Sequence, residues 1–144
     1  MKIEKSGSKP TRRGPSEWFT GDVWVDEIAP PDAPARVHVL RVSFEPGART
    51  AWHSHPLGQV LHIIAGLGRV QKSGEPTVDV HPGDTVWIPP DERHWHGAAP
   101  GHSMVHLAVQ RATDDGTEVT WYEQVAPADY APELAKAADP ARSG

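Results

Sequence analysis

Short hydrophobic runs, separated by turn residues, dominate the chain from Arg36 onward. Several runs alternate hydrophobic with polar residues, a pattern that places every second side chain on the same face of an extended strand. Helical periodicity is almost absent, so the pattern predicts an all-β sandwich or barrel. The expected strands cover residues 36–44, 59–66, 68–74, 77–81, 84–89, 103–111 and 118–125.

The two ends of the chain differ from this middle part. Residues 1–16 are polar and without periodicity, which predicts a flexible N-terminal arm. The barrel domain is expected over residues 17–125, beginning with a strand around Val23–Val25. Residues 126–144 form a tail rich in alanine and proline, for which we expect one short helix near residues 132–138 and then disorder. A chain of 144 residues is the size of one domain.

The composition excludes several classes of protein. There is no cysteine, so a disulfide scaffold, a thiolate metal site and a cysteine nucleophile are excluded. The formal net charge of −5 argues against a nucleic-acid partner. No apolar stretch is long enough for a membrane helix, and the N-terminus does not resemble a secretory signal, so a cytoplasmic protein is expected. The unusual feature is the presence of nine histidines.

Three of these histidines, with one glutamine, form a candidate metal site. His53 and His55 are two residues apart and share a face if the chain is extended there. Gln59 follows a short turn, and His94 comes much later. Three imidazoles and an amide oxygen suit a divalent transition metal. The His53–His55 pair by itself fits two surface histidines equally well.

Two further histidines are candidate acid/base groups. His96 shares a face with His94 if this segment is extended. His106 lies on the same face of its predicted strand as Met104, Ala108 and Gln110, which suits a barrel interior. Imidazoles near a bound cation resist protonation and stay available as bases at neutral pH. The alternative for His106 is a histidine that only packs in the core.

The remaining histidines and the tryptophans are expected to have structural roles. His62 should point away from Gln59, and His38, His81 and His102 are expected to be solvated at turns or strand ends. Trp52 and Trp95 flank the candidate ligands with opposite parity, so we expect both to pack outside the site.

The spacing of the candidate ligands resembles that of the cupin family. The interval pattern Gly47-x5-His53-x-His55-x3-Gln59-x6-Gly66 is similar to the first cupin motif, and Gly83-x5-Pro89-x4-His94 is similar to the second. The resemblance covers about residues 36–111 and implies a jelly-roll barrel (a double-stranded β-helix) that holds one metal. The chain departs from the usual pattern at Gln59, where cupins have glutamate, at Asp91, where they have glycine, and at Ala98, where they have asparagine. Asp91 can adopt a left-handed turn conformation.

Gln59 bears on the chemistry, because a neutral ligand set leaves the full charge on a divalent metal. Such a site favours Lewis-acid chemistry and disfavours the higher oxidation states that an oxygenase needs. Residues 14–125 resemble more narrowly the small bacterial manganese cupins that include the cupin hydroxynitrile lyases and the carboxymuconolactone-decarboxylase-associated cupins. In that group glutamine is the usual fourth ligand.

This narrower resemblance implies a role for each site residue. The implied ligands of Mn²⁺ are His53, His55, Gln59 and His94. His96 and His106 would be the catalytic acid/base residues. The implied substrate-binding residues are Gln110, which would hydrogen-bond in the pocket, and Leu40, Val42 and Leu61, which predict an apolar interior.

The function expected from this set is a metal-dependent lyase that acts on a small, apolar or aromatic, hydroxyl-bearing substrate. Mn²⁺ is the expected cofactor, with Fe²⁺ or Zn²⁺ as alternatives. The alternative functions are a sugar- or uronate-processing cupin, an Fe²⁺-dependent dioxygenase and a non-catalytic ligand-binding cupin. Exposed sheet edges in this fold are commonly covered by another subunit, so a homodimer or homotetramer is expected.

Overall fold

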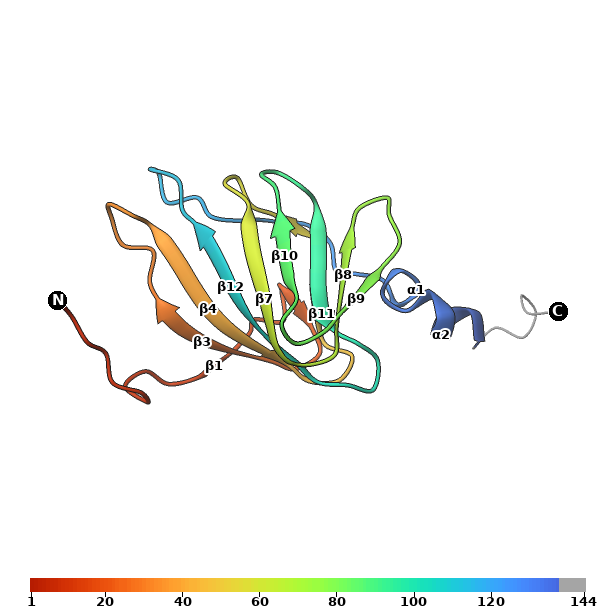
Figure 1. The fold of residues 1–144 in the computed structure, drawn as a ribbon. Helices are drawn as coiled ribbons and strands as arrows, with labels where there is room; N and C mark the ends of the chain where they lie inside the picture. Colours follow the sequence, from red (N-terminus) through yellow and green to blue (C-terminus); the bar gives the residue numbers. More distant parts are fainter. Residues whose placement is uncertain (138–144) are drawn as a thin grey trace.

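The computed structural model describes residues 1–137 and consists of two antiparallel sheets with a short helical segment at one end (Figure 1). In spatial order, the first sheet contains β1 (Arg12–Arg13), β3 (Val23–Ala29), β4 (Val37–Phe44), β12 (Met104–Arg111), β7 (Gln59–Gly66) and β10 (Thr85–Ile88). The second contains β13 (Thr120–Trp121), β6 (His53–Ser54), β11 (His94–Ala98), β5 (Arg49–Thr50) and β2 (Phe19–Thr20), with β8 (Gly68–Lys72) joining β11 to β9 (Val78–Val80). The helices are α1 (Pro127–Tyr130) and α2 (Pro132–Ala137).

The long strands of the first sheet form because their sequences alternate. In β12 the even-numbered residues from Met104 to Gln110 are buried and most of the others are partly exposed, as the pattern predicts. Pairing with β4 and β7 places His106 opposite Val42 and Gln110 opposite Gln59. The inward face of three adjacent strands therefore carries most of the candidate site residues.

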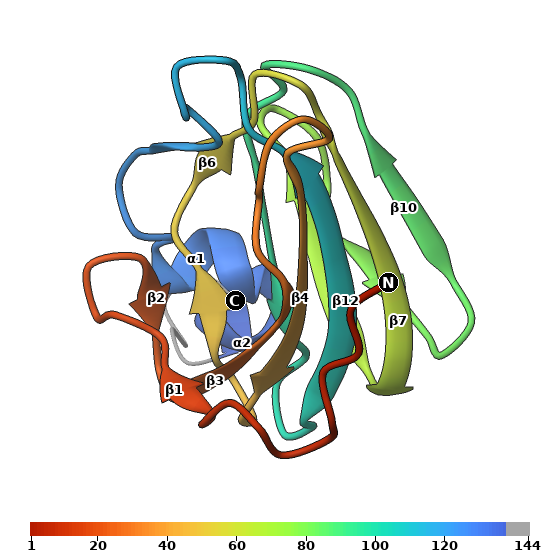
Figure 2. The same cartoon turned by 90° about the vertical axis from the view of Figure 1, so that its left-hand side faces the viewer.

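The second sheet is built from shorter strands and faces the first, as the two groups of strands in Figure 2 show. β11 is buried along its whole length and pairs with β5, β6 and β8. Its pairing with β6 sets His94 directly opposite His53. Two residues far apart in the sequence thus become cross-strand neighbours.

The apolar core fills one end of the space between the sheets. It includes Val23, Phe44, Ile63 and Met104, all of them 1% exposed or less. A separate cluster packs Trp52 and Trp95 against the C-terminal segment around Tyr130. The expected packing role of these two tryptophans is confirmed, and the other end of the barrel is left for the site.

Most sequence expectations about the elements agree with the structure. The strands expected between residues 36 and 111 are present, and the helix expected near residues 132–138 is found at Pro132–Ala137, preceded by the unexpected α1; residues 138–144 of the predicted tail lie outside the described residues. The strand expected over residues 118–125 shortens to β13, because only Thr120–Trp121 pairs with β6 in a regular ladder. No helix among the described residues is long and apolar enough to cross a membrane.

The predicted arm does not stay clear of the barrel. Arg12–Arg13 pairs with Val25 and Trp24 of β3, and Thr11 hydrogen-bonds the Asp26 carboxylate. The sheet therefore begins within residues 1–16, because the edge of β3 offers unpaired backbone groups to this segment.

Replacing Gly66 by alanine tests the close packing at the end of β7. Gly66 has φ +80°, and a Cβ there would lie 1.9 Å from the Ser103 carbonyl oxygen. Gly74 has φ +85° but open space around it, so Gly74→Ala is a matched control for the backbone strain alone. In urea denaturation we expect Gly66→Ala to lower the free energy of unfolding by at least about 2 kcal/mol more than Gly74→Ala. Equal losses would contradict the close packing.

Candidate metal centre and adjoining cavity

The predicted ligands come together from three segments. His53 in β6 and His94 in β11 are cross-strand partners, with ring centroids 4.2 Å apart. The His55 ring lies 5.1 Å from that of His53, and Gln59 begins β7 beside them. The turn before β11 contains Asp91 at φ +63°, whose N–H donates to the His55 carbonyl oxygen at 2.9 Å. Asp91 adopts the left-handed conformation that aspartate tolerates in turns.

Backbone carbonyls fix the tautomer of each predicted histidine ligand. Nδ1 of His53 donates to the Ala51 oxygen at 2.9 Å, Nδ1 of His55 to the Glu118 oxygen at 2.8 Å, and Nδ1 of His94 to the Glu92 oxygen at 2.8 Å. A carbonyl oxygen can only accept, so in each ring Nδ1 carries the proton. The Nε2 lone pairs are thereby free to bind a metal. Histidine ligands in metal sites commonly donate their other ring N–H to a carbonyl oxygen in the same way.

Several nitrogen and oxygen atoms of the site that can only accept hydrogen bonds face one another, and no N–H or O–H group of residues 1–137 lies between them. The His94 Nε2 and the Gln59 Oε1 atoms lie 3.1 Å apart, and neither carries a hydrogen when His94 is neutral. The buried His55 Nε2 has no hydrogen-bond partner among the described residues. Ring nitrogens of His53, His94 and His96 lie within 4.8 Å of one another. Converging lone pairs of this kind fit a cation, so this buried three-histidine group can hold a metal.

Burial keeps these imidazoles neutral. Desolvation lowers the pKa of His53 and of His96 well below the usual value, and it lowers the pKa of His94 to about 4. Burial also lowers the pKa of His55. Neutral imidazoles are the form that binds metals and accepts protons, and here the protein interior provides it without any cation.

The two predicted acid/base residues form a hydrogen-bonded pair. His106 Nε2 and His96 Nδ1 lie 2.9 Å apart, so one ring donates to the other. His96 Nε2 and His106 Nδ1 are buried and have no partner among the described residues. Burial lowers the pKa of His106 to about 4. His96 lies within the three-histidine group and also touches His106, so it connects His106 to the candidate ligands.

A cavity of about 640 Å³ opens beside this pair, which is a typical size for a small-molecule site. Among the predicted substrate-binding residues, Leu40, Val42 and Gln110 line it. Leu61 does not, which corrects the sequence expectation: its side chain is fully buried and packs with Ile88 and Ala108 instead. The alternation along β7 correctly places the Leu61 side chain on the inward face, but other core side chains pack against it and separate it from the cavity.

Sequence reasoning missed a polar cluster on the cavity wall. His38, expected to be solvated, donates from Nδ1 to Glu118 Oε1 at 2.5 Å and from Nε2 to Glu27 Oε2 at 2.8 Å. Gln110 Nε2 donates to the same Glu118 oxygen at 2.7 Å. His38 and Glu118 are 80 residues apart in the chain, and no local pattern indicates their contact.

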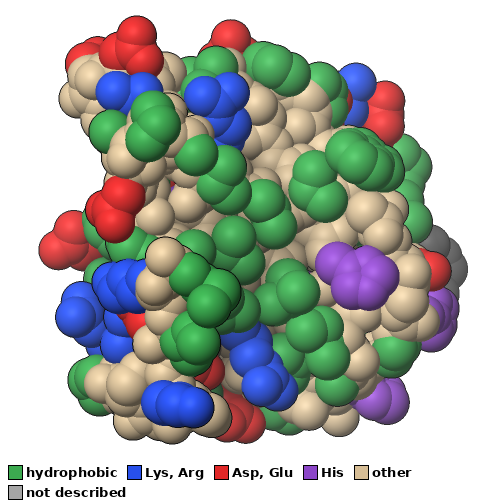
Figure 3. Space-filling view, turned by 60° about the vertical axis from the view of Figure 1, so that its left-hand side comes forward, with side chains coloured by type: hydrophobic (Ala, Val, Ile, Leu, Met, Phe, Trp, Pro, Cys, Tyr) green, Lys and Arg blue, Asp and Glu red, His purple; other side chains and the backbone are tan. Residues whose placement is uncertain are grey.

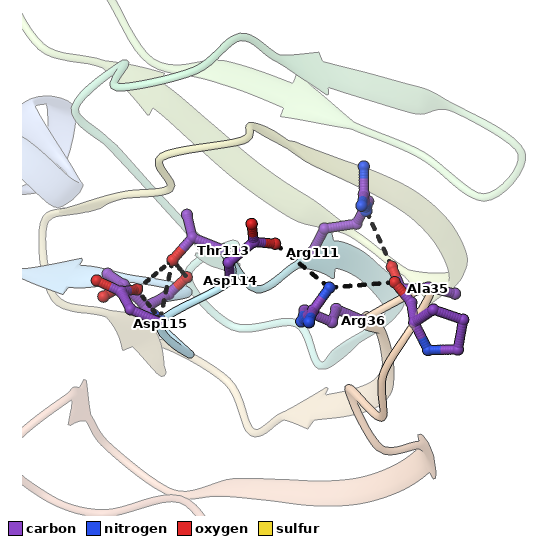
Figure 4. Close-up of polar contacts among 8 residues, drawn as sticks. Ala35, Arg36, Arg111, Thr113, Asp114 and Asp115 are labelled. Carbon is purple, nitrogen blue, oxygen red and sulfur yellow. Dashed lines mark hydrogen bonds and ion pairs between the residues drawn. The ribbon is translucent and has the colours of Figure 1, made fainter.

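A tight loop after β12 delivers Glu118 to this position. Thr113 and Asp115 hydrogen-bond each other, the Thr117 N–H donates to Asp115 at 3.0 Å, and the Thr113 N–H donates to the Thr117 oxygen at 2.8 Å (Figure 4). Arg36 contacts Asp114 at 3.3 Å, which ties the loop to the start of β4 (Figure 4). Gly, Asp and Thr residues in the DDGT turn were a signal for the loop but not for the position of Glu118, which follows it, on the cavity wall.

The N-terminal segment also contributes to the cavity. Lys9, Pro10, Arg12 and Pro15 are among its lining residues. This contribution depends on the pairing of β1 with β3 and has no sequence signal of its own.

The contribution of His38 to the free energy of unfolding is expected to depend on pH. Its hydrogen bond to the Glu118 carboxylate, assisted by Glu27, raises the pKa of His38 despite partial burial. The stabilisation is therefore complete below the usual histidine pKa and is lost as the pH rises through the raised value. We expect wild type to exceed His38→Gln by about 1 kcal/mol in unfolding free energy near pH 6, and by much less at pH 9. The exposed His62 supplies the control His62→Gln; a difference independent of pH would contradict a charged His38.

Known proteins place these features in a family. The chain matches the Cupin_2 family (cupin domain) over residues 40–109. It is 49% identical over 130 residues to an (R)-mandelonitrile lyase from Granulicella tundricola, covering 90% of this chain and 98% of that protein. The structure of a cupin-like protein from Thermotoga maritima is 38% identical, with a TM-score of 0.78 over 92% of this chain and 96% of that one.

A more distant structure shares the fold alone. The polyketide cyclase RemF from Streptomyces resistomycificus is 17% identical, with a TM-score of 0.67 over 99% of this chain and 96% of that one. The two sheets, the spacing of the motifs and the histidines that this spacing brings together in the barrel agree with these matches, and the chain belongs to the cupin family.

Proposed function

We propose that this protein is a metal-dependent lyase that cleaves an aromatic cyanohydrin to an aldehyde and hydrogen cyanide, and catalyses the reverse addition. The observation that carries the proposal is the buried, neutral His96–His106 pair. It lines the cavity next to the converging acceptor atoms of the three-histidine group. The identity of 49% to an (R)-mandelonitrile lyase over nearly its whole length supports the same reaction.

The residues of the chain account for the proton transfers. His106, acting with His96, takes the proton from the substrate hydroxyl. The electron pair of the O–H bond then forms the carbonyl, and the bond to the nitrile carbon breaks with its electron pair on cyanide. The protonated pair returns its proton to the cyanide, which leaves as hydrogen cyanide. Burial lowers the pKa of His106, so the ring is neutral at neutral pH and its free nitrogen can accept the substrate proton.

A bound divalent cation would supply Lewis acidity that lowers the pKa of the substrate hydroxyl. We propose His53, His55, Gln59 and His94 as its ligands, because the Nε2 atoms of His53, His55 and His94 are freed by backbone carbonyls and Gln59 presents its oxygen to His94. We propose Mn²⁺ as the metal, since nitrogen and amide-oxygen ligands without thiolate suit it, with Fe²⁺ and Zn²⁺ as the competitors in a metal-content measurement.

The walls of the cavity support a small aromatic substrate. Leu40, Val42, Phe44 and Trp121 provide an apolar surface, and the polar cluster of His38, Gln110 and Glu118 lies on the same wall. A sugar or uronate would leave its several hydroxyls against these apolar side chains, which costs hydrogen bonds.

The test is an assay of purified, Mn²⁺-loaded protein on mandelonitrile and on a panel of aliphatic cyanohydrins and aldols. The proposal expects metal-dependent release of benzaldehyde and cyanide, with a preference for the aromatic substrate. No turnover of any cyanohydrin would overturn it. Turnover of a uronate, oxygen consumption with Fe²⁺, or tight ligand binding without turnover would favour the sugar-processing, dioxygenase or binding alternative, respectively.

We also propose that the protein forms a homodimer or homotetramer. β10 is the edge strand of the first sheet, and its Trp87 side chain is 76% exposed. Hydrophobic side chains gather on the face seen in Figure 3. Such an edge is commonly covered by another subunit. A light-scattering mass of 15.7 kDa at micromolar concentration would contradict this proposal.

A further inference from the structure

We propose that Glu118 is a positioning residue that fixes the side-chain amide of Gln59 with its oxygen toward the imidazoles, and that Glu118 is the reason position 59 takes glutamine and not glutamate. The proposal rests on the proposed function only in treating the imidazole group as a metal site. It concerns the ligand set and makes no use of the reaction catalysed.

Two hydrogen bonds through Gln110 connect Glu118 to the candidate ligand Gln59. Gln110 Nε2 donates to Glu118 Oε1 at 2.7 Å, and Gln59 Nε2 donates to Gln110 Oε1 at 2.9 Å. The remaining oxygen of Gln59 then lies 3.1 Å from His94 Nε2. The two glutamines come from β7 and β12, where residues 59 and 110 are register partners, so backbone pairing holds their side chains together.

We call this chain of hydrogen bonds from Gln59 through Gln110 to Glu118 the relay. Glu118 sets the orientation of both side-chain amides in it. An ionised carboxylate can only accept hydrogen bonds, so Gln110 must present its NH₂ group there. Gln110 then has only its oxygen for Gln59, which must in turn donate from its own NH₂ group. Gln59 and Gln110 are 6% and 8% exposed, so water does not readily compensate a flipped amide. The oxygen of Gln59 therefore points toward the three-histidine group.

Glu118 is itself firmly held. His38 Nδ1 donates to its carboxylate at 2.5 Å, and its backbone oxygen accepts from His55 Nδ1 at 2.8 Å. The hydrogen bonds of His38, Gln110 and His55 restrict Glu118 from three directions. One residue therefore orients two candidate ligands, His55 through its backbone and Gln59 through its side chain.

The relay predicts what a carboxylate at position 59 would meet. A glutamate side chain there could not donate to Gln110, so an oxygen of Gln110 would face either the new carboxylate or the one of Glu118. A second change, Glu118→Gln, removes this conflict. Its NH₂ group can donate to Gln110 Oε1, which leaves the NH₂ group of Gln110 to donate to position 59. Glu118→Gln alone keeps an oxygen that accepts from Gln110 and His38, so it leaves the relay intact.

The experiment compares wild type, Gln59→Glu, Glu118→Gln and Gln59→Glu/Glu118→Gln. For each protein we measure the Mn²⁺ dissociation constant by calorimetry and the melting temperature of the chelated, metal-free form. We expect Glu118→Gln to melt close to wild type and to bind Mn²⁺ no more tightly than wild type, and Gln59→Glu to melt about 3 °C lower or more. The double variant should recover most of that loss and bind Mn²⁺ at least about tenfold more tightly than Gln59→Glu.

The Mn²⁺ result separates positioning from simple charge. Removing the negative charge of Glu118 should weaken cation binding by electrostatics alone, whereas the relay predicts tighter binding in the Gln59→Glu background. Glu27, the other carboxylate bonded to His38, provides the control Gln59→Glu/Glu27→Gln, which removes a nearby charge outside the relay and should give no recovery. Equal recovery by Glu27→Gln, or none by Glu118→Gln, would overturn the proposal. If the wild type takes up no Mn²⁺, the melting temperatures decide alone, and no measurement depends on turnover.

Discussion

Replacing His106 by asparagine is expected to lower kcat for cyanohydrin cleavage by about 10²–10⁴-fold, the range typical of a lost general base. His106 is fully buried, lines the cavity and hydrogen-bonds His96 at 2.9 Å. Asparagine can keep a hydrogen bond to His96 but cannot take up a proton. The effect should appear mainly in kcat, because the apolar residues that bind the substrate ring are unchanged.

The matched control is His62→Asn, which removes an exposed histidine whose ring bonds Thr85 outside the barrel. Its rate should equal that of wild type. Melting temperatures and Mn²⁺ content of both variants show whether either change acts through folding or metal loss. A His106→Asn enzyme with normal metal content and a kcat close to that of wild type would refute the proposed base.

Replacing His94 by alanine is expected to weaken Mn²⁺ binding by more than about 100-fold, and to reduce cyanohydrin cleavage to the level of chelated wild type. His94 pairs with His53 across the strands, faces the Gln59 oxygen and is fixed from behind by the Glu92 carbonyl. Losing it removes one of the converging lone pairs that make the site suitable for a cation. Calorimetric Mn²⁺ titration and metal analysis of the purified protein measure the change.

The exposed His102 supplies the control, since His102→Ala should alter neither metal content nor rate. The same experiment tests the role of His96. If His96→Ala retains Mn²⁺ and loses activity, His96 acts with the base; if it loses Mn²⁺ as His94→Ala does, His96 is a ligand, as its place in the three-histidine group allows. Unchanged Mn²⁺ affinity in His94→Ala would contradict the proposed site.

Much of the fold and the core of the site could be predicted from local sequence patterns. A period of two places His53 with His55 and His106 with Gln110 on one face of an extended chain, and the structure buries all four. The intervals around Gly47–Gly66 and Gly83–His94 resemble the two cupin motifs, and this resemblance implied that their segments meet, as β6, β11 and β7 do. The period of two carries the face of each residue because strand geometry repeats regularly along the chain.

The same patterns failed where the outcome depends on contacts between distant loops. Leu61 faces inward as expected, but core packing with Ile88 keeps it from the cavity. His38 is held by Glu118, which a loop brings back from 80 residues away, and residues 9–15 reach the cavity only because β1 pairs with β3. No periodicity encodes these meetings.

By itself, the sequence determined the β-rich class and the inward-facing residues, because each follows from side-chain direction along a strand, and its resemblance to the cupin motifs indicated the candidate ligands. Only the tertiary structure decided which nitrogen of each histidine is free, and that the Gln59 oxygen faces His94. His53 and His94 donate to carbonyls two residues earlier in their own segments, whereas His55 donates to the carbonyl of the distant Glu118 and Gln110 donates to the Glu118 carboxylate. Side-chain direction is local, whereas the polarity of a buried amide or imidazole is set by whatever partner the fold places beside it.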